Sequence, residues 1–258
     1  ILGQKQQYEQ KFKAWAKGKP EYENIFTDWE KTYAAWRPYA KHRQYINEGI
    51  NGSPLIAFAG SLLQLEAALV KPGTPMTDVK KLAEAADKQR TAFLAEENKV
   101  SDQQVVAAIT KMFYEDIEKK QQPIGFYGTL KNAYGPLDDD ATYKKYAADL
   151  FSKTMIFDDN KWKAFIANPD GVALQSDPAF AHASAFFTNY ISKYNPYFQQ
   201  FNTSNAEFGR LYIKGIMEMD PVKAKMMYPD ATSTMRVSYG AVKSYRPRDA
   251  VFYDYVTT

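Results

Sequence analysis

The stretch "SPLIAFAGSLLQLEAALV", residues 53–70, decides the fold of this chain. Its apolar run from Pro54 to Val70 is the longest in the sequence and is interrupted by Gln64 and Glu66. As a helix the run would be about 25 Å long, and a bilayer span needs ~20 predominantly apolar residues. The run therefore predicts a helix buried in a protein core, and we expect no membrane span.

Ser53, the residue before this run, raises the question of catalysis. It stands between Gly52 and Pro54, and a serine so placed resembles the nucleophile loop of a chymotrypsin-type protease. A serine followed by proline at the first helical position is also a helix start signal, because its hydroxyl accepts a hydrogen bond from a free amide and proline there loses none. We favour the interpretation of Ser53 as a helix cap.

A serine nucleophile also needs a base, and the chain has only two histidines. His42 lies between Lys41 and Arg43 in a predicted helix, where neighbouring positive charge would oppose protonation. His182 lies in "DPAFAHASAFF", on a helix that is apolar on several sides. We expect each to be a surface or core-edge histidine, and we assign no catalytic residue in this chain.

On both sides of residues 53–70, apolar residues continue to recur at helical spacing. "KQQYEQKFKAWAKG" places Tyr8, Phe12 and Trp15 at helical spacing. A longer helix is predicted over about 21–50, and Pro38 should kink or interrupt it. One stripe of this helix is expected to consist of Ile25, Trp29, Tyr33 and Trp36. Further helices are predicted over 77–98, 101–120, 143–153, 160–167, 178–194 and from there to about 219, with an interruption near Pro196.

Polar residues at several helix starts are interpreted as caps. We expect Thr77 to cap one helix and Ser101 to form a capping box with Gln104. The acidic runs 138–140 and 158–160 precede predicted helices, where negative charge favours the N-terminal dipole. Neither run has the spaced oxygens and turn glycine of a calcium loop, so we expect no metal site.

Near the C-terminus the spacing of the apolar residues changes from a helical repeat to every second residue. Met235, Val237 and Tyr239 alternate with polar residues, and "DAVFYDYVTT" at 249–258 is rich in β-favouring residues. Two strands without further partners do not make a stable sheet. The predicted fold is therefore mainly α, with a multi-helix domain over 1–231 and a β-tail over 232–258 whose sheet lies elsewhere.

Composition excludes several function classes. The 33 basic and 30 acidic residues give a net charge of +3 and form no basic block, so nucleic-acid binding is not expected. The absence of Cys removes disulfides and thiolate nucleophiles. The glycines of "GFYGTLKNAYG" at 125–135 lack the spacing of a phosphate loop, and no cofactor is expected. The N-terminus shows neither signal peptide nor initiator Met, which fits a mature or excised piece.

The stretch from Leu211 to Thr258, "LYIKGIMEMDPVKAKMMYPDATSTMRVSYGAVKSYRPRDAVFYDYVTT", closely resembles a segment of the bacterial serine dipeptidyl peptidases. The matching residues are Met217, Glu218, Met219, Tyr228, Pro229, Asp230, Ala231, Ser233, Thr234, Arg236, Tyr239, Gly240, Val242, Lys243, Tyr245, Pro247, Arg248, Asp249, Ala250 and Val251. "DLFSKTMIFDDNKWKAFIANP" at 149–169 and "DPAF" at 177–180 also resemble that family, and the resemblance is looser before residue 149.

This resemblance implies a chymotrypsin-type double β-barrel interrupted by a helical domain that covers the active-site cleft. Such enzymes release dipeptides from peptide N-termini, act in the periplasm or at the cell surface, and form homodimers. They include acidic-specific and hydrophobic-specific members. The chain would then be the helical regulatory or lid domain, with residues 232–258 returning to a barrel outside it. The resemblance implies that the family's catalytic His and Asp lie before Ile1 and its Ser after Thr258. The residues that hold the substrate's amino terminus in the family lie outside the matched segments as well, and we assign no substrate-binding residue in this chain.

Two alternatives belong to other function classes. A stand-alone helical module that binds a ligand or a protein would have residues 232–258 pair within this chain or with a partner. A complete hydrolase would use Ser53 with His42 or His182, and would hydrolyse a chromogenic dipeptide by itself.

Overall fold

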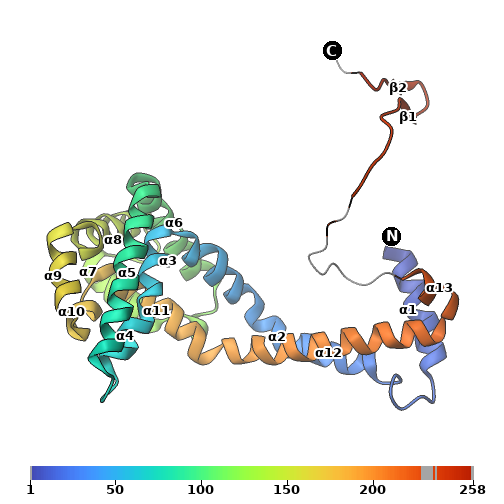
Figure 1. The fold of residues 1–258 in the computed structure, drawn as a ribbon, viewed down its shortest axis with the longest axis horizontal. Helices are drawn as coiled ribbons and strands as arrows, with labels where there is room; N and C mark the ends of the chain where they lie inside the picture. The colour runs from blue at the N-terminus through green and yellow to red at the C-terminus, as the bar shows by residue number, and fades with distance from the viewer. Residues whose placement is uncertain (1, 228–234, 236, 257–258) are drawn as a thin grey trace.

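The computed structural model describes residues 2–227, 235 and 237–256, and these residues are mainly α-helical (Figure 1). The α-helices are α1 (Leu2–Ala16), α2 (Ile25–Gln44), α3 (Pro54–Ser61), α4 (Leu63–Val70), α5 (Met76–Glu96), α6 (Lys99–Asp116), α7 (Ile124–Tyr134), α8 (Asp140–Lys153), α9 (Asp159–Ala167), α10 (Gly171–Gln175), α11 (Pro178–Lys193), α12 (Asn195–Met219) and α13 (Pro221–Met226). Short β1 (Tyr245–Arg248) and β2 (Val251–Tyr253) follow. The predicted fold class is confirmed.

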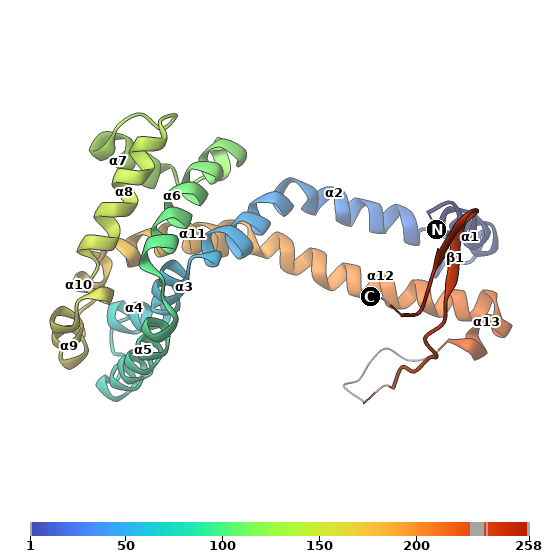
Figure 2. The same ribbon diagram turned by 90° about the horizontal axis from the view of Figure 1, so that it is seen from above.

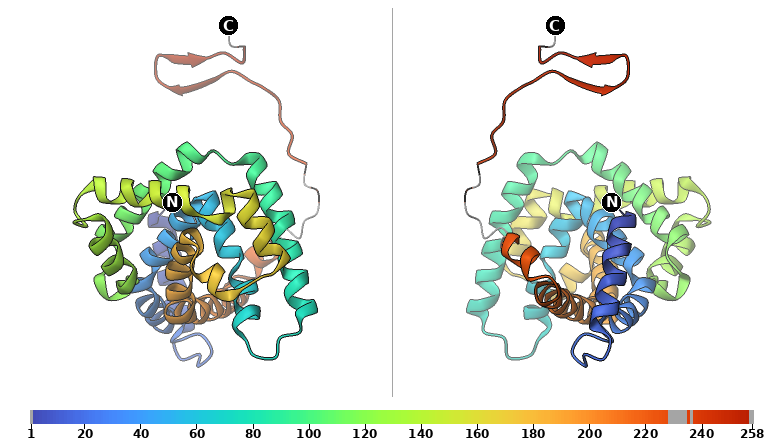
Figure 3. Two further views of the ribbon diagram at one scale, coloured as in Figure 1. Left: turned by 90° about the vertical axis from the view of Figure 1, so that its left-hand side faces the viewer. Right: turned by 90° about the vertical axis from the view of Figure 1, so that its right-hand side faces the viewer.

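The molecule is elongated and has three parts. Helices α2 and α12 run antiparallel and form a long arm (Figures 1 and 2). One end of the arm carries the head, which consists of α3–α11, and the other end carries the base, where α1 and α13 pack on the arm. Viewed along the arm, the helices of the head surround the end of α11 and α12 (Figure 3).

Aromatic side chains hold the two arm helices together. The predicted stripe of α2 faces α12, where Trp29, Tyr33 and Trp36 meet a matching row of rings with centroids 5.0–6.2 Å apart. That row consists of Phe198, Phe201, Phe208 and Tyr212. The Trp29 indole donates to Asn205 Oδ1 at 2.8 Å, so the one polar atom of this side chain is satisfied.

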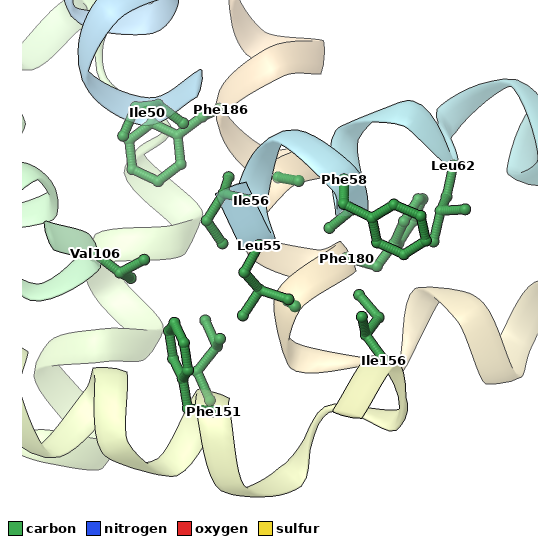
Figure 4. Packing of buried hydrophobic residues seen from close by; sticks show 14 of the residues in the cluster. Ile50, Leu55, Ile56, Phe58, Leu62, Val106, Phe151, Ile156, Phe180 and Phe186 are labelled. Carbon is green, nitrogen blue, oxygen red and sulfur yellow. The ribbon is translucent and has the colours of Figure 1, made fainter. Parts of the chain in front are cut away.

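The apolar run at 53–70 forms the centre of the head, as predicted. Leu55 and Ile56 of α3 lie among Val106 of α6, Phe151 of α8 and Phe180 of α11 (Figure 4). Among the described residues no single helix combines the length and the apolarity of a membrane span, and the segments Ile25–Gly52 and Pro54–Val70 meet both criteria only together, across a bend of 102°.

The run nevertheless forms two helices instead of one, with a break at Leu62. The Ser61 hydroxyl donates to the Phe58 carbonyl at 2.6 Å, and the Leu62 amide bonds the Ala59 carbonyl, three residues back. A serine that bonds back to its own helix competes with the regular ladder. This bond and the tightened last turn accompany the end of α3.

The predicted interruption of α2 at Pro38 is wrong, because the helix continues to Gln44. Pro38 and Ala34 are both exposed, so the carbonyl that loses its amide partner is solvated at low cost. The regular helix ends instead at a π-helical turn, Tyr45–Gly49, where the arm enters the head.

Two predicted caps are wrong. Helix α5 begins at Met76 after Pro75, without a side-chain cap from Thr77. Helix α6 begins at Lys99, where Asn98 Oδ1 accepts from the Ser101 amide at 3.2 Å. Asn98 caps the helix three residues earlier than predicted, so Ser101 lies inside the first turn and its own amide is the one that is capped.

The acidic caps are confirmed, and three helices, α7, α10 and α13, were not predicted. Asp139 accepts from the Ala141 amide, and Asp158 accepts from the amides of Asn160 and Lys161. Helix α6 ends at Asp116 and not near residue 120. The glycine-containing segment after Pro123 forms α7.

The C-terminal hairpin differs in place from the predicted strands. Residues 237–244 form no strand, and β1 pairs antiparallel with β2 alone within the described part of the chain. The hairpin stands apart from the helices, and its aromatic side chains are exposed (Figures 1 and 3). An alternating segment becomes a strand only beside a partner, and residues 237–244 have none here. The predicted boundary between 231 and 232 lies outside the described residues.

Candidate functional site

Ser53 caps α3, as the sequence predicts. Its side chain is fully buried, its backbone is extended, and its Oγ accepts from the Ile56 amide at 3.2 Å. Pro54 follows at the first helical position. A buried hydroxyl committed to a helix N-terminus is not presented to a substrate.

The polar neighbours of Ser53 are carboxyl groups. Asp102, which is 3 % exposed, accepts from the Leu55 amide at 2.9 Å. Burial raises the pKa of Asp102, and hydrogen bonds from Ser53 and Leu55 oppose this shift. The carboxyl oxygens of Glu97 are also buried and have no hydrogen-bond donor among the described residues. Two carboxyl groups that face each other in a buried place favour sharing one proton. Such a pair does not supply the base that a serine nucleophile needs.

His42 lies where the arm enters the head. Its Nδ1 is 3.3 Å from Gln121 Oε1, and its ring packs among Phe113, Tyr190 and Tyr194. Burial lowers the pKa of His42 to about 4, against a hydrogen bond with Gln121. The imidazole is therefore neutral at physiological pH, and desolvation is the cause.

His182 is enclosed in the core of the head. Its Nδ1 is 2.9 Å from the hydroxyl of Tyr146, and its ring stacks on Phe186 at 4.8 Å. Burial lowers the pKa of His182 to about 3. Both histidines are 1 % exposed, so the prediction of surface or core-edge positions is wrong. A flat neutral imidazole fills a gap between aromatic rings, which sequence spacing does not reveal.

The structure does not bring the three candidate residues together. Neither histidine is hydrogen-bonded to Ser53 in the part of the chain that the structure describes. Nor do three or more His, Asp or Glu side chains gather there in an arrangement that could hold a metal ion. The pair of Glu97 and Asp102, five residues apart, gave no sequence signal, because its carboxyl groups meet through the bend between α5 and α6.

The Glu97 carboxyl should make stability depend on pH. Burial, followed by the charge of Asp102, raises the pKa of Glu97 to about 7. Because the pKa is higher in the folded state, the free energy of unfolding should fall as pH rises from about 4.5 to 8. We expect Glu97→Gln to be the more stable protein above pH 8 by about 1–2 kcal/mol, allowing for solvent screening of this partly exposed side chain.

Urea denaturation at pH 5 and pH 8.5 measures this effect. The matched control is Glu96→Gln, since Glu96 is exposed. The advantage of Glu97→Gln should grow with pH while that of the control stays flat. An advantage that is equal at both pH values would contradict the buried acid pair.

Two of the surface grooves formed by the described residues are considered as candidates for binding. One lies between α6 and α8 of the head, where Lys111 Nζ bonds Asp140 at 2.8 Å and Glu115 at 3.0 Å. Hydrogen bonds to these carboxylates raise the pKa of Lys111, so its charge is already compensated. The second lies on the outside of the base and is apolar. It is lined by Gly209, Arg210, Ile213, Lys214, Met217, Glu218, Pro221 and Ala224.

The first and the last described helices meet at the base. The ammonium of Lys223 in α13 lies 3.7 Å from the centre of the Tyr8 ring in α1. The head is at the opposite end of the arm (Figure 2). Helices α1 and α13 therefore lie on the same side of this helical unit.

Comparison with known proteins places these features in a family. A family model described as Peptidase S46 matches residues 1–258. The chain is 30 % identical over 99 % of its length to an Asp/Glu-specific dipeptidyl-peptidase of Flavobacterium psychrophilum, covering 35 % of that protein. It is 26 % identical over 93 % of its length to dipeptidyl-peptidase 7 of Capnocytophaga gingivalis, covering 32 %. The chain thus spans about a third of the curated relatives that it matches.

A solved structure has the same fold. The crystal structure of Porphyromonas endodontalis DPP11 in complex with the dipeptide Arg-Glu matches 95 % of this chain with a TM-score of 0.66. The identity is 22 %, and the match covers 34 % of that protein. Because the family model matches the chain from end to end, this protein belongs to the peptidase S46 family.

Proposed function

We propose that this chain is the helical domain of a serine-type dipeptidyl peptidase, and that it covers and gates the active-site cleft of the parent enzyme. The observation that carries the proposal is the placement of α1 and α13 together at the base, with the head at the far end of a long arm. A unit attached by one end can bring its other end over a cleft and away from it.

The parent enzyme would supply the chemistry. The candidate residues Ser53, His42 and His182 lie apart and buried, which supports a catalytic triad and oxyanion hole outside residues 1–258. The relatives are about three times as long as this chain. In the parent, a β-barrel would hold the nucleophile, and this domain would exclude long or internal peptide segments.

Substrate, assembly and location are parts of the same proposal. The parent would bind peptides by their free N-terminus and release dipeptides, as the names of its relatives suggest. It would form a homodimer and act in the periplasm or at the cell surface. The outer edges of the β1–β2 hairpin have no partner strand among the described residues, which favours a larger sheet over a stand-alone binding module.

The test uses the full-length protein and a variant without the head. Residues 46–193 can be replaced by a short Gly-Ser linker, because Tyr39 in α2 and Tyr197 in α12 stack at 4.4 Å next to the cut. We expect the full-length enzyme to release dipeptides from free N-termini and to leave N-acetylated peptides intact. The headless variant should cleave acetylated peptides at least 10-fold faster than the full-length enzyme.

Two outcomes would overturn the proposal. Failure of the full-length protein to release dipeptides would refute the activity, and unchanged selectivity in the headless variant would refute the gate. Labelling with a serine-reactive fluorophosphonate reports whether the barrel of that variant is folded. Full-length Ser53→Ala should keep its kcat, because Ser53 is a cap; its inactivity despite a folded core would favour Ser53 as nucleophile.

A further inference from the structure

The outside of the base carries an apolar stripe that the helical unit does not use. The inward face of α12 packs its aromatic residues and Ile216 against the arm and base. The outward face repeats Gly209, Ile213 and Met217 at intervals of four residues, and α13 adds Pro221 and Ala224. Ile213 and Met217 are 44 % and 46 % exposed. Apolar side chains gathered in a groove mark an interaction site more than scattered ones do.

Gly209 is the floor of this groove. A methyl group added there would meet no atom within 4 Å, so the packing of this chain does not require glycine. Glycine inside a helix costs about 1 kcal/mol relative to alanine. At Gly215, six residues later, the packing of this chain does require glycine, because an added methyl group would lie 2.7 Å from the Phe12 ring. A bare backbone at Gly209 instead suits a second surface that approaches α12 closely.

On the charged rim of the groove, one cation has no ion-pair partner among the described residues. Lys214 bonds Glu21 at 2.7 Å, and Glu218 accepts from the Tyr22 hydroxyl at 2.9 Å. Arg210 forms no ion pair with any residue that the structure describes. A surface that covers the apolar stripe would complement Arg210 with a carboxylate.

We propose that the groove is the seat on which the β-barrel part of the same full-length chain docks, with apolar side chains against Ile213 and Met217 and a carboxylate against Arg210. This inference rests on the proposed function. The matched segment is about a third of each relative, so the rest of a relative is about twice as long as this chain. In the full-length protein that additional chain would join this unit at the base, where the groove lies. Val222 and Met226 of α13 are also exposed apolar side chains of the base.

Thiol labelling of the full-length protein tests this occupant. Residues 1–258 contain no Cys, so Met217→Cys adds one thiol to the groove, and labelling of the unsubstituted protein gives the background. The matched controls are Val100→Cys and Val172→Cys on the head, at 72 % and 70 % exposure. We expect maleimide to modify Met217→Cys at least 10-fold more slowly than either control, at every protein concentration.

The labelling results that would contradict the proposal are distinct from one another. Equal labelling rates mean an open groove, and protection that disappears on dilution means that a second copy covers it. Gly209→Leu in the Met217→Cys background should block the seat and raise labelling to the rate of the controls; continued protection would overturn the assignment. Dipeptide release by the unsubstituted protein is measured separately, so an active enzyme with an open groove refutes this inference alone.

Discussion

Replacing Asp177 with alanine is expected to lower the free energy of unfolding by about 4 kcal/mol, since several buried donors lose their acceptor. The carboxylate is 5 % exposed and joins two segments of the head. It accepts from the Met155 amide at 2.6 Å and from the Thr154 hydroxyl at 3.0 Å. It also caps α11 by accepting from the amides of Ala179 and Phe180.

Urea denaturation followed by circular dichroism measures this loss. Asp170→Ala is the matched control, because Asp170 caps α10 at the exposed surface with one bond to the Ala173 amide, at 2.7 Å. A cap of that kind contributes about 1 kcal/mol. Asp177→Asn should fall between the two, because an amide keeps one acceptor oxygen. Similar losses for Asp177→Ala and Asp170→Ala would show that Asp177 acts as a simple cap.

Replacing Phe12 with alanine should remove about 3–5 kcal/mol from the stability of the base. The side chain is fully buried and contacts the rings of Tyr22, Phe26 and Tyr212 at 4.9–6.2 Å. The buried core of the base is small and separate from that of the head. Loss of its central ring should therefore release α1 and leave the head folded.

Hydrogen exchange resolved by peptide distinguishes the two regions. In Phe12→Ala the amides of α1 should exchange at least 100-fold faster, whereas those of α3 and α11 should keep their protection. Tyr33→Ala, at a residue that is 43 % exposed on the arm, serves as the control and should change neither region by more than a few-fold. Equal loss of protection in base and head would mean one cooperative core.

Much of the helical framework follows from local sequence. The caps at Ser53, Asp139 and Asp158 were predicted because each satisfies free amides two or three residues away. The aromatic stripe of α2 was predicted from helical spacing alone. Where local signals compete, prediction failed. Asn98 displaced Ser101 as a cap, and the glycines after Pro123 concealed α7.

The candidate sites depended on contacts between distant segments. His42 is buried among rings from distant helices and contacts Gln121, which lies 79 residues later in the chain. The acid pair arises where Asp102 bonds the amide of Leu55, 47 residues earlier. The outer stripe of α12 has helical spacing, so its signal was present in the sequence. Only the packed structure shows which stripe faces the arm and which remains open.

By itself, the sequence determined the mainly helical class, most helix positions and the resemblance to the dipeptidyl peptidases. Helical period and capping depend on residues within one or two turns, so they can be read along the chain. The tertiary structure decided that, among the described residues, neither histidine contacts Ser53 as a base, that the two histidines are neutral, and that the base core is separate from the head. Each of these depends on desolvation and packing by segments far apart in sequence, because burial sets a group's protonation and access.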